Sequence, residues 1–198
     1  MIAIIDYGAG NIRSVTNALG RLGAEWRLTA DPAEIMKADR VLLPGVGHGG
    51  EALARLRATG LPDTIVRLRH PVLGICVGMQ VMCRHTAEGD AEGLGIFDTR
   101  IRRFEPRSAA DKVPHMGWNN LGNLESKLFR GIEGGERVYF VHSYYAPLCP
   151  DTIATVRWGS ERMMLSAALK YENFYATQFH PEKSGDTGER ILRNFLEL

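Results

Sequence analysis

The segment Pro71-Val-Leu-Gly-Ile-Cys76-Val-Gly-Met-Gln80 decides how the rest of the chain is interpreted. It begins as an apolar run typical of a buried strand, and a helical pattern follows Cys76. In a sharp strand–turn–helix elbow the nucleophile stands out of the sheet with a strained backbone, and the residues two before and two after it must be small. Gly74 and Gly78 meet this requirement. The segment therefore predicts that Cys76 is a nucleophile at such an elbow.

The elbow also predicts a chemical environment for the Cys76 sulfur. It directs the sulfur along the axis of the following helix, whose positive end favours a thiolate over a thiol. A free thiol has a pKa of about 8.5, so a cysteine nucleophile needs such help at neutral pH. The alternative is a buried core cysteine, which is the usual role of a lone cysteine in an apolar run. The flanking glycines, together with a histidine described below, favour the nucleophile.

Length and composition limit the class of protein. A chain of 198 residues fits one domain over residues 1–198, and its 44% hydrophobic content can form a substantial core. The net charge is +1 with no basic stripe, which argues against nucleic-acid binding. The three cysteines, Cys76, Cys83 and Cys149, lack C-x-x-C spacing, so neither a disulfide framework nor a zinc site is expected. With no leader peptide and no membrane-length apolar run, we expect a cytoplasmic protein.

The alternation of apolar runs and amphipathic segments predicts the fold class. Strands are expected at residues 2–5, 25–28, 41–43 and 72–75, and helices at 12–22, 32–38 and 77–84. A further helical pattern follows the glycine cluster after residue 43 and continues through Arg69. Such alternation is typical of an α/β fold with a mostly parallel central sheet flanked by helices.

The second half of the chain has a different pattern. Short strand-like pieces separated by turn residues occur at 99–104, 137–142, 153–158, 163–169 and 174–177. We expect them to be antiparallel strands that widen the central sheet. A helix over 191–196, with Ser184 or Asp186 near its start, is expected to close the fold.

A second chemical constellation follows the last predicted strand, in Gln178-Phe-His180-Pro-Glu182-Lys-Ser184. A cysteine nucleophile needs a base, and the base needs an acceptor on its other ring nitrogen. In extended chain, residues i and i+2 point the same way, so Glu182 can reach the imidazole of His180. A surface His–Glu pair is the alternative. Among the six histidines only His180 has both a strand end before it and a carboxylate two residues on, which favours it as the partner of Cys76.

The glycine-rich loop Leu43-Pro-Gly45-Val-Gly47-His-Gly-Gly50 lies between a predicted strand and a predicted helix. An acyl-transfer intermediate needs two N–H donors at its oxyanion, one from the residue after the nucleophile, here Val77. Val46 or Gly47 can supply the other. A flexible loop and a phosphate-binding loop are the alternatives, although the Lys-Ser/Thr ending of a P-loop is absent.

Two weaker features have ordinary interpretations. Asp6-Tyr-Gly-Ala-Gly-Asn11 begins like a dinucleotide-binding fingerprint, but Arg13 stands in place of the third glycine, so a tight turn capped by Asn11 is favoured. A basic patch is formed by Arg100, Arg102, Arg103 and Arg107. Most such runs are solvated surfaces, and a partner surface is the alternative.

Taken together, the motifs resemble a known family. Gly74-Ile-Cys76-Val-Gly-Met-Gln80 and His180-Pro-Glu182 resemble the nucleophile and His–Glu motifs of class I, triad-type glutamine amidotransferases, which have a flavodoxin-like fold. Further blocks resemble the glutaminase subunits of imidazole glycerol phosphate synthase. These are Asp6-Tyr-Gly-Ala-Gly-Asn11, Pro44-Gly-Val-Gly47, His115-Met-Gly-Trp-Asn119, Val141-His-Ser-Tyr-Tyr145 and His180-Pro-Glu-Lys-Ser184.

The resemblance implies a role for each matching residue and no cofactor or metal. Cys76 would attack the carboxamide of glutamine, His180 would move protons, and Glu182 would orient His180. Val46 and Val77 would be the oxyanion donors. Glutamine would be held by Gly45, Gly47, Gln80, Ser143 and Tyr144. The chain differs from the family pattern at Val77, where leucine is usual, and at His48-Gly49, where Ala/Asp-Phe is common.

The resemblance also implies a partner. Ammonia released into water at neutral pH is protonated and no longer nucleophilic, so a separate chain must receive it along a dry path. In the family the ammonia-receiving chain is a (β/α)₈-barrel cyclase, which forms imidazole glycerol phosphate and AICAR. It binds the glutaminase as a 1:1 heterodimer. Asn11, Trp118 and Lys183 would be partner contacts. The alternatives are the glutaminase of another pathway, such as pyridoxal phosphate synthesis, a stand-alone γ-glutamyl hydrolase, and a non-catalytic regulatory subunit.

Overall fold

The computed structural model describes residues 1–198 and contains short strands and helices that alternate in its first half. The first-half elements are β1 Ile2–Ile5, α1 Ile12–Arg21, β2 Trp26–Thr29, α2 Pro32–Lys37, β3 Arg40–Gly45, α3 Gly49–Ala58, α4 Pro62–Val66, β4 Val72–Cys76, α5 Val77–Met82, β5 Cys83–Thr86 and β6 Ala91–Glu92. The second half contains β7 Phe97–Arg103, β8 His115–Asn120, η1 Lys127–Phe129, β9 Arg137–His142, β10 Tyr144–Tyr145, β11 Thr152–Trp158, β12 Met163–Tyr171, β13 Phe174–Thr177, η2 Pro181–Lys183 and α6 Gly185–Leu196.

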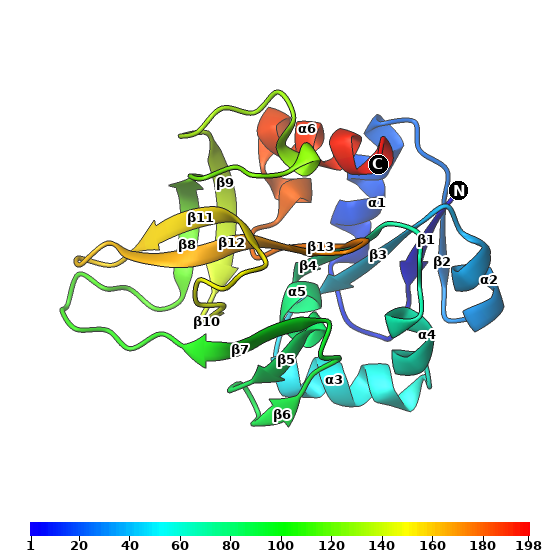
Figure 1. The fold of residues 1–198 in the computed structure, drawn as a ribbon, viewed down its shortest axis with the longest axis horizontal. Coiled ribbons are helices and arrows are strands. Elements are labelled where there is room, and N and C mark those ends of the chain that lie inside the picture. Colours follow the sequence, from blue (N-terminus) through cyan, green and yellow to red (C-terminus); the bar gives the residue numbers. More distant parts are fainter.

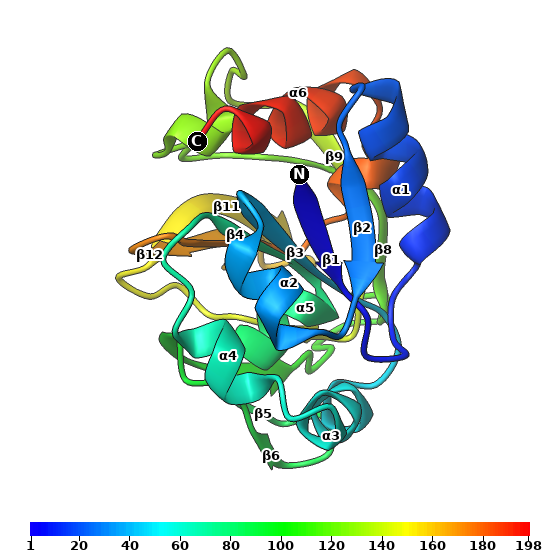
Figure 2. The same cartoon turned by 90° about the vertical axis from the view of Figure 1, so that its right-hand side faces the viewer.

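A seven-stranded sheet in the order β11-β12-β13-β4-β3-β1-β2 forms the centre of the molecule. The five strands from β13 to β2 run parallel, and β12 and β11 add an antiparallel edge. Helices α1 and α6 cover one face, while α3, α4 and α5 lie on the other (Figure 1, Figure 2). The predicted α/β fold with a mostly parallel, helix-flanked sheet is confirmed.

Local sequence explains the helix starts in the parallel half. Asn11 caps α1 by accepting a hydrogen bond from the Ser14 N–H at 3.3 Å, and Asp31 caps α2 by accepting one from the Ala33 N–H at 2.8 Å. These side-chain oxygens satisfy N–H groups that have no partner within the helix. The turn-and-cap interpretation of Asn11 is therefore confirmed.

Cys83 and Arg84 are a correction to the sequence-based expectation of a helix over 77–84. Helix α5 ends at Met82, and Cys83–Thr86 forms strand β5 between β6 and β7. The backbone at Cys83 is already extended, with φ −70° and ψ 166°. Pairing with two neighbouring strands thus outweighs the local helical pattern, because a local pattern carries no information about partner strands elsewhere in the chain.

The antiparallel strands of the second half do not all widen the central sheet, as had been expected. Only β11 and β12 do so, whereas β13 is parallel to β4. The strand predicted at 99–104 belongs to a separate four-stranded sheet, β10-β7-β5-β6. The strand predicted at 137–142 pairs instead with β8, a strand that the sequence reading missed.

One core joins these sheets. A single cluster of 53 buried hydrophobic residues runs through the molecule, so the smaller sheets pack on the central one rather than forming separate cores. None of the helices combines the length and apolar character needed to cross a bilayer.

The topology brings three segments to one edge of the central sheet. Gly45 at the end of β3 pairs with Cys76 at the end of β4, and Thr177 at the end of β13 pairs with Ile75. In parallel sheets the crevice beyond the carboxyl ends of the strands is where ligands bind. The glycine loop, Cys76 and the segment that contains His180 therefore meet at this edge.

Candidate active site

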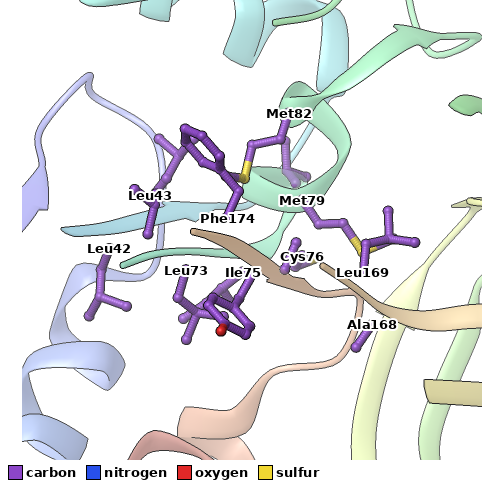
Figure 3. Packing of buried hydrophobic residues seen from close by; sticks show 14 of the residues in the cluster. Leu42, Leu43, Leu73, Ile75, Cys76, Met79, Met82, Ala168, Leu169 and Phe174 are labelled. Atoms are coloured by element: carbon purple, nitrogen blue, oxygen red, sulfur yellow. The ribbon is translucent and has the colours of Figure 1, made fainter. Parts of the chain in front are cut away.

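Cys76 lies at the junction of β4 and α5 with φ 55° and ψ −108°, a conformation that side chains other than glycine rarely adopt. Figure 3 shows Cys76 at the end of this strand, close to Ile75 and Met79. The strained elbow predicted at this position is confirmed. Such strain persists only where the surrounding structure enforces it, and here the residue that carries it is the predicted nucleophile.

The two glycines beside Cys76 allow the chain to fold back. A Cβ added to Gly78 would lie 1.9 Å from the Leu43 carbonyl oxygen, and one added to Gly74 would lie 2.5 Å from Met82 Sδ. Gly45 faces the same contact from the glycine loop, since its Cβ would lie 2.5 Å from the Gly78 nitrogen. The loop and the elbow are thus packed backbone to backbone, as the requirement for small residues predicted.

His180 and Glu182 form a buried pair directly after β13. His180 Nδ1 lies 2.7 Å from Glu182 Oε1, and their side chains are 2% and 1% exposed. Two links hold the segment to β9. The His180 N–H donates to the Tyr139 carbonyl, and the Ser184 hydroxyl accepts from the Tyr139 N–H while donating to the His180 carbonyl. The other ring nitrogen, Nε2, has no hydrogen-bond partner.

The electrostatics of this pair favour a charged imidazole. Burial disfavours the charged form, but the neighbouring Cys76 and Glu182 outweigh it and raise the pKa of His180 to about 10. The group is therefore an imidazolium at neutral pH, beside the sulfur that Cys76 presents. This is the charge state suited to donating a proton to a leaving group.

A cavity of about 720 Å³ contains most of the residues implied by the family resemblance. Its lining includes the predicted residues Cys76, Val77, Gln80, Val46, Gly47, Ser143, Tyr144, His180, Asn11 and Lys183. Three others lie outside it. Glu182 is buried behind His180, Gly45 packs against Gly78, and Trp118 is 48% exposed on β8.

The glycine loop is anchored at both ends. At its start, the Tyr7 hydroxyl donates to the Pro44 carbonyl at 2.8 Å. At its end, His48 Nδ1 accepts from the Glu51 N–H and caps α3, and the Gly49 N–H donates to Glu88 Oε2 at 2.6 Å. The departure from the family pattern at His48 therefore supplies a helix cap, while the bond to Glu88 comes from the backbone of residue 49.

Two residues of the site were missed by sequence reasoning. Glu88 lines the cavity and contributes a carboxylate, but it follows a strand that was read as helix, so nothing placed it near Cys76. Gln178 is fully buried and its Nε2 lies 3.8 Å from Cys76 Sγ. It stands inside the motif that contains His180, and a glutamine two residues before the predicted base was the available signal.

The basic segment predicted around Arg100–Arg107 lies away from the candidate site. Arg102, Arg103 and Arg107 border a different cavity, of about 580 Å³, which shares no lining residue with the site, and Arg107 pairs with Glu161. No three histidine, cysteine, aspartate or glutamate side chains are arranged to hold a metal ion.

Comparisons with known proteins agree with this geometry. Residues 3–198 match the family model described as glutamine amidotransferase class-I. Two solved structures share the fold. One, described as a glutamine amidotransferase, has a TM-score of 0.74 and 19% identity over 100% of this chain and 98% of its own. The other, PurLQS from Thermotoga maritima, has a TM-score of 0.70 and 19% identity over 99% of this chain and 97% of its own. At this identity they show the fold alone.

Curated relatives narrow the family. The imidazole glycerol phosphate synthase subunit HisH of Bacteroides thetaiotaomicron is 55% identical over 100% of this chain and 99% of its own length. The protein of the same name from Xanthomonas campestris pv. campestris is 44% identical, covering 100% and 97%. The chain belongs to the class I glutamine amidotransferases and, within them, to the HisH subunits of imidazole glycerol phosphate synthase. The family resemblance inferred from the sequence motifs is confirmed.

Proposed function

We propose that this chain hydrolyses glutamine to glutamate and ammonia through Cys76, His180 and Glu182. The observation that carries the proposal is the meeting of an elbow cysteine and a buried His–Glu pair at one cavity. The ammonia then passes to a cyclase subunit that forms imidazole glycerol phosphate and AICAR in histidine biosynthesis. This part is supported by the HisH relatives. The three free cysteines suit the reducing conditions of the cytoplasm, where we place the enzyme.

The chemistry proceeds in two halves. The Cys76 thiolate attacks the carboxamide carbon, and the resulting oxyanion accepts hydrogen bonds from the backbone N–H groups of Val46 and Val77. The C–N bond breaks as His180 gives its proton to the departing nitrogen. The nitrogen leaves as ammonia, and the glutamyl group stays on Cys76 as a thioester. Water then attacks the thioester, His180 takes the proton from that water, and glutamate leaves with the thiolate restored. Glu182 keeps the imidazole oriented throughout.

Substrate recognition follows from the polar groups of the cavity. The Glu88 carboxylate and the unpartnered Gln80 Oε1 are acceptors suited to the α-ammonium group of glutamine. The backbone around Gly47, Ser143 and Tyr144 lies on the same lining and would contact the rest of the amino acid. Gly45 acts from behind the lining, by placing the loop against Gly78.

The partner surface surrounds the cavity mouth and strand β8. Asn11 and Lys183 lie on the cavity lining, and Val46, Met116 and Trp118 are 38%, 66% and 48% exposed. Large exposed apolar side chains next to a site that must deliver ammonia are suited to an interface. We propose a (β/α)₈-barrel cyclase, bound 1:1, as the chain that covers them.

The test is a reconstitution with the cyclase encoded by the same organism. We expect glutamine hydrolysis by the isolated chain to be slow and to rise by about 10²–10³ when the substrate-loaded cyclase completes the oxyanion site. Cys76→Ala should abolish glutamine-dependent synthesis and leave ammonia-dependent synthesis by the complex intact. Equal glutaminase rates with and without cyclase would refute the partner, and an active Cys76→Ala protein would refute the nucleophile.

A matched control separates this pathway from its alternatives. The synthase that forms pyridoxal phosphate, which is a different ammonia acceptor, should give no stimulation of the same preparation. Stimulation by that synthase but not by the cyclase would assign the chain to the other pathway.

A further inference from the structure

Gln178 is a buried residue in direct contact with Cys76, and the proposed mechanism assigns Gln178 no role. It lies between β13 and His180, and its side chain is fully excluded from solvent. Its Nε2 has one hydrogen-bond partner, Cys76 Sγ at 3.8 Å, and its Oε1 lies 3.1 Å from Gln80 Nε2. A buried amide at this position is costly unless both of its ends are satisfied, and here both are.

The direction of the Gln178 amide is determined by a backbone carbonyl. The Tyr144 carbonyl oxygen, which can only accept, lies 3.3 Å from the Gln80 side-chain amide. The end of Gln80 that meets it must therefore be the nitrogen. The same nitrogen meets Gln178, so the end of Gln178 facing Gln80 must be its oxygen. The remaining end, which faces the Cys76 sulfur, is the N–H donor.

Two buried histidines hold the Tyr144 carbonyl in place. Burial lowers the pKa of His142 to about 3 and that of His115 to about 4, so both are neutral at physiological pH. His142 Nδ1 donates to the Tyr144 carbonyl at 2.7 Å, its Nε2 accepts from His115 Nδ1 at 2.9 Å, and His115 Nε2 accepts from Asn119 at 3.1 Å. Every bond in this chain agrees with the amide directions assigned above.

We propose that Gln178 is a further catalytic residue, which stabilises the Cys76 thiolate by donating a hydrogen bond from Nε2 to the sulfur. The inference rests on the proposed function, in which this sulfur is the nucleophile. Hydrogen bonds to a charged acceptor are about twice as strong as neutral ones, and the dry surroundings strengthen them further. A neutral amide can provide this without competing with His180 for the proton. Gln80 Oε1 is then the one end of the two amides without a hydrogen-bond partner.

The test measures the thiolate directly, with neither glutamine nor cyclase present. The full chain is alkylated with iodoacetamide between pH 5 and 10, and mass spectrometry of the Cys76 peptide gives the rate at each pH. In Gln178→Met, which keeps the length and loses the donor, we expect the rate at pH 7 to fall about tenfold. The rate on the high-pH plateau should stay at the wild-type value. Gln178→Glu should fall further, because a carboxylate repels the thiolate.

The control is Thr177→Val, an isosteric change at the end of the same strand whose hydroxyl donates to the Phe179 carbonyl and not to the sulfur. It should leave the pH profile of alkylation unchanged. A Gln178→Met profile identical to wild type, or one lowered equally at every pH, would overturn the proposal in favour of a packing role.

A second variant keeps the question answerable if Gln178→Met does not fold, as judged by circular dichroism. Gln80→Met removes the anchor of the Gln178 amide and should shift the profile in the same direction by a smaller amount; an unshifted profile would overturn the proposal. The assay requires no turnover, so its failure leaves the glutaminase assignment to be judged separately by the Cys76→Ala reconstitution.

Discussion

His180 has two tasks in the proposed reaction, since it gives a proton to the departing ammonia and later takes one from water. Its pKa of about 10 answers the first task, because the proton is present when the tetrahedral intermediate collapses. The sign for stability is also clear. A histidine whose pKa is raised from 6.5 to about 10 stabilises the folded state fully below pH 6.5, and this contribution is lost as pH rises through 10.

The charge of His180 can be observed directly. A nitrogen-detected NMR titration should find its imidazole protonated at pH 8, where an ordinary histidine is neutral. Cys76→Ala should move the titration midpoint to lower pH, because it removes a neighbour that favours the charge. His142 is the internal control and should stay neutral from pH 5 to 8 in both proteins. A neutral His180 at pH 8 in the wild type would contradict the assigned charge state.

At the scale of elements, the site depends on how closely β3, β4 and α5 approach one another. Gly45 and Gly78 let the backbones of the loop and the helix touch, and Tyr7, in the turn after β1, donates a hydrogen bond to the Pro44 carbonyl. Because the contact is between backbones, no rotamer change can relieve an added methyl group. The glycine loop is therefore positioned by elements that are rigid on both sides.

Gly78→Ala tests this close approach. The new Cβ would meet the Leu43 carbonyl oxygen at 1.9 Å, so we expect a loss of at least about 2 kcal/mol in the free energy of unfolding and a large loss of glutaminase activity. Urea unfolding and the reconstituted assay measure the two. Gly20→Ala, at the exposed penultimate position of α1 with nothing within 4 Å of the new Cβ, is the control and should raise stability by about 0.5 kcal/mol. Equal stabilities for the two variants would contradict the packing argument.

At the scale of the whole molecule, three sheets share one core, and the small sheet β8–β9 brings polar residues into it. His115 and His142, on these two strands, face each other and pack around Phe104 and Phe140. An apolar core admits them because each nitrogen is hydrogen-bonded. Their neutral state is therefore a condition of the fold as well as of the Tyr144 carbonyl.

The fold should consequently lose stability in mild acid. Both histidines hold pKa values of about 3 and 4 in the folded chain against 6.5 when unfolded, so the unfolded state binds more protons as pH falls below 6.5. Between pH 7 and pH 5 we expect a loss on the order of 2 kcal/mol per histidine in urea unfolding. His115→Gln should show a shallower loss, and Met116→Gln, exposed on the same strand, should keep the full one. Identical pH dependence in wild type and His115→Gln would contradict this account.

Local rules were sufficient where the relevant physics is local. The spacing of Gly74, Cys76 and Gly78 predicted a strained elbow, and the bounds of β1, β9 and β13 match the predicted strands residue for residue. The i, i+2 spacing of His180 and Glu182 predicted their hydrogen bond, now seen at 2.7 Å. The chemical roles of these residues stay predictions until the variants are assayed.

Nonlocal contacts account for what the sequence reading missed. The first two residues of β5, Cys83 and Arg84, were predicted as helix because the partner strands β6 and β7 lie further along the chain. Glu88 was overlooked for the same reason, and the contact of Gln178 with Cys76 joins residues 102 positions apart. Side-chain periodicity carries no information about such pairings, since it reports only which face of an element is buried.

The amino-acid sequence by itself determined the α/β class, the elbow that strains Cys76, and the pairing of His180 with Glu182, because each depends on neighbours within a few residues. Only the tertiary structure decided which carboxylate lines the cavity, which amide faces the sulfur, and which way the Gln80 and Gln178 amides point. It also decided how three sheets divide the second half of the chain. These outcomes depend on the register of parallel strands and on the desolvation of polar groups within a shared core. Both arise only when distant segments meet.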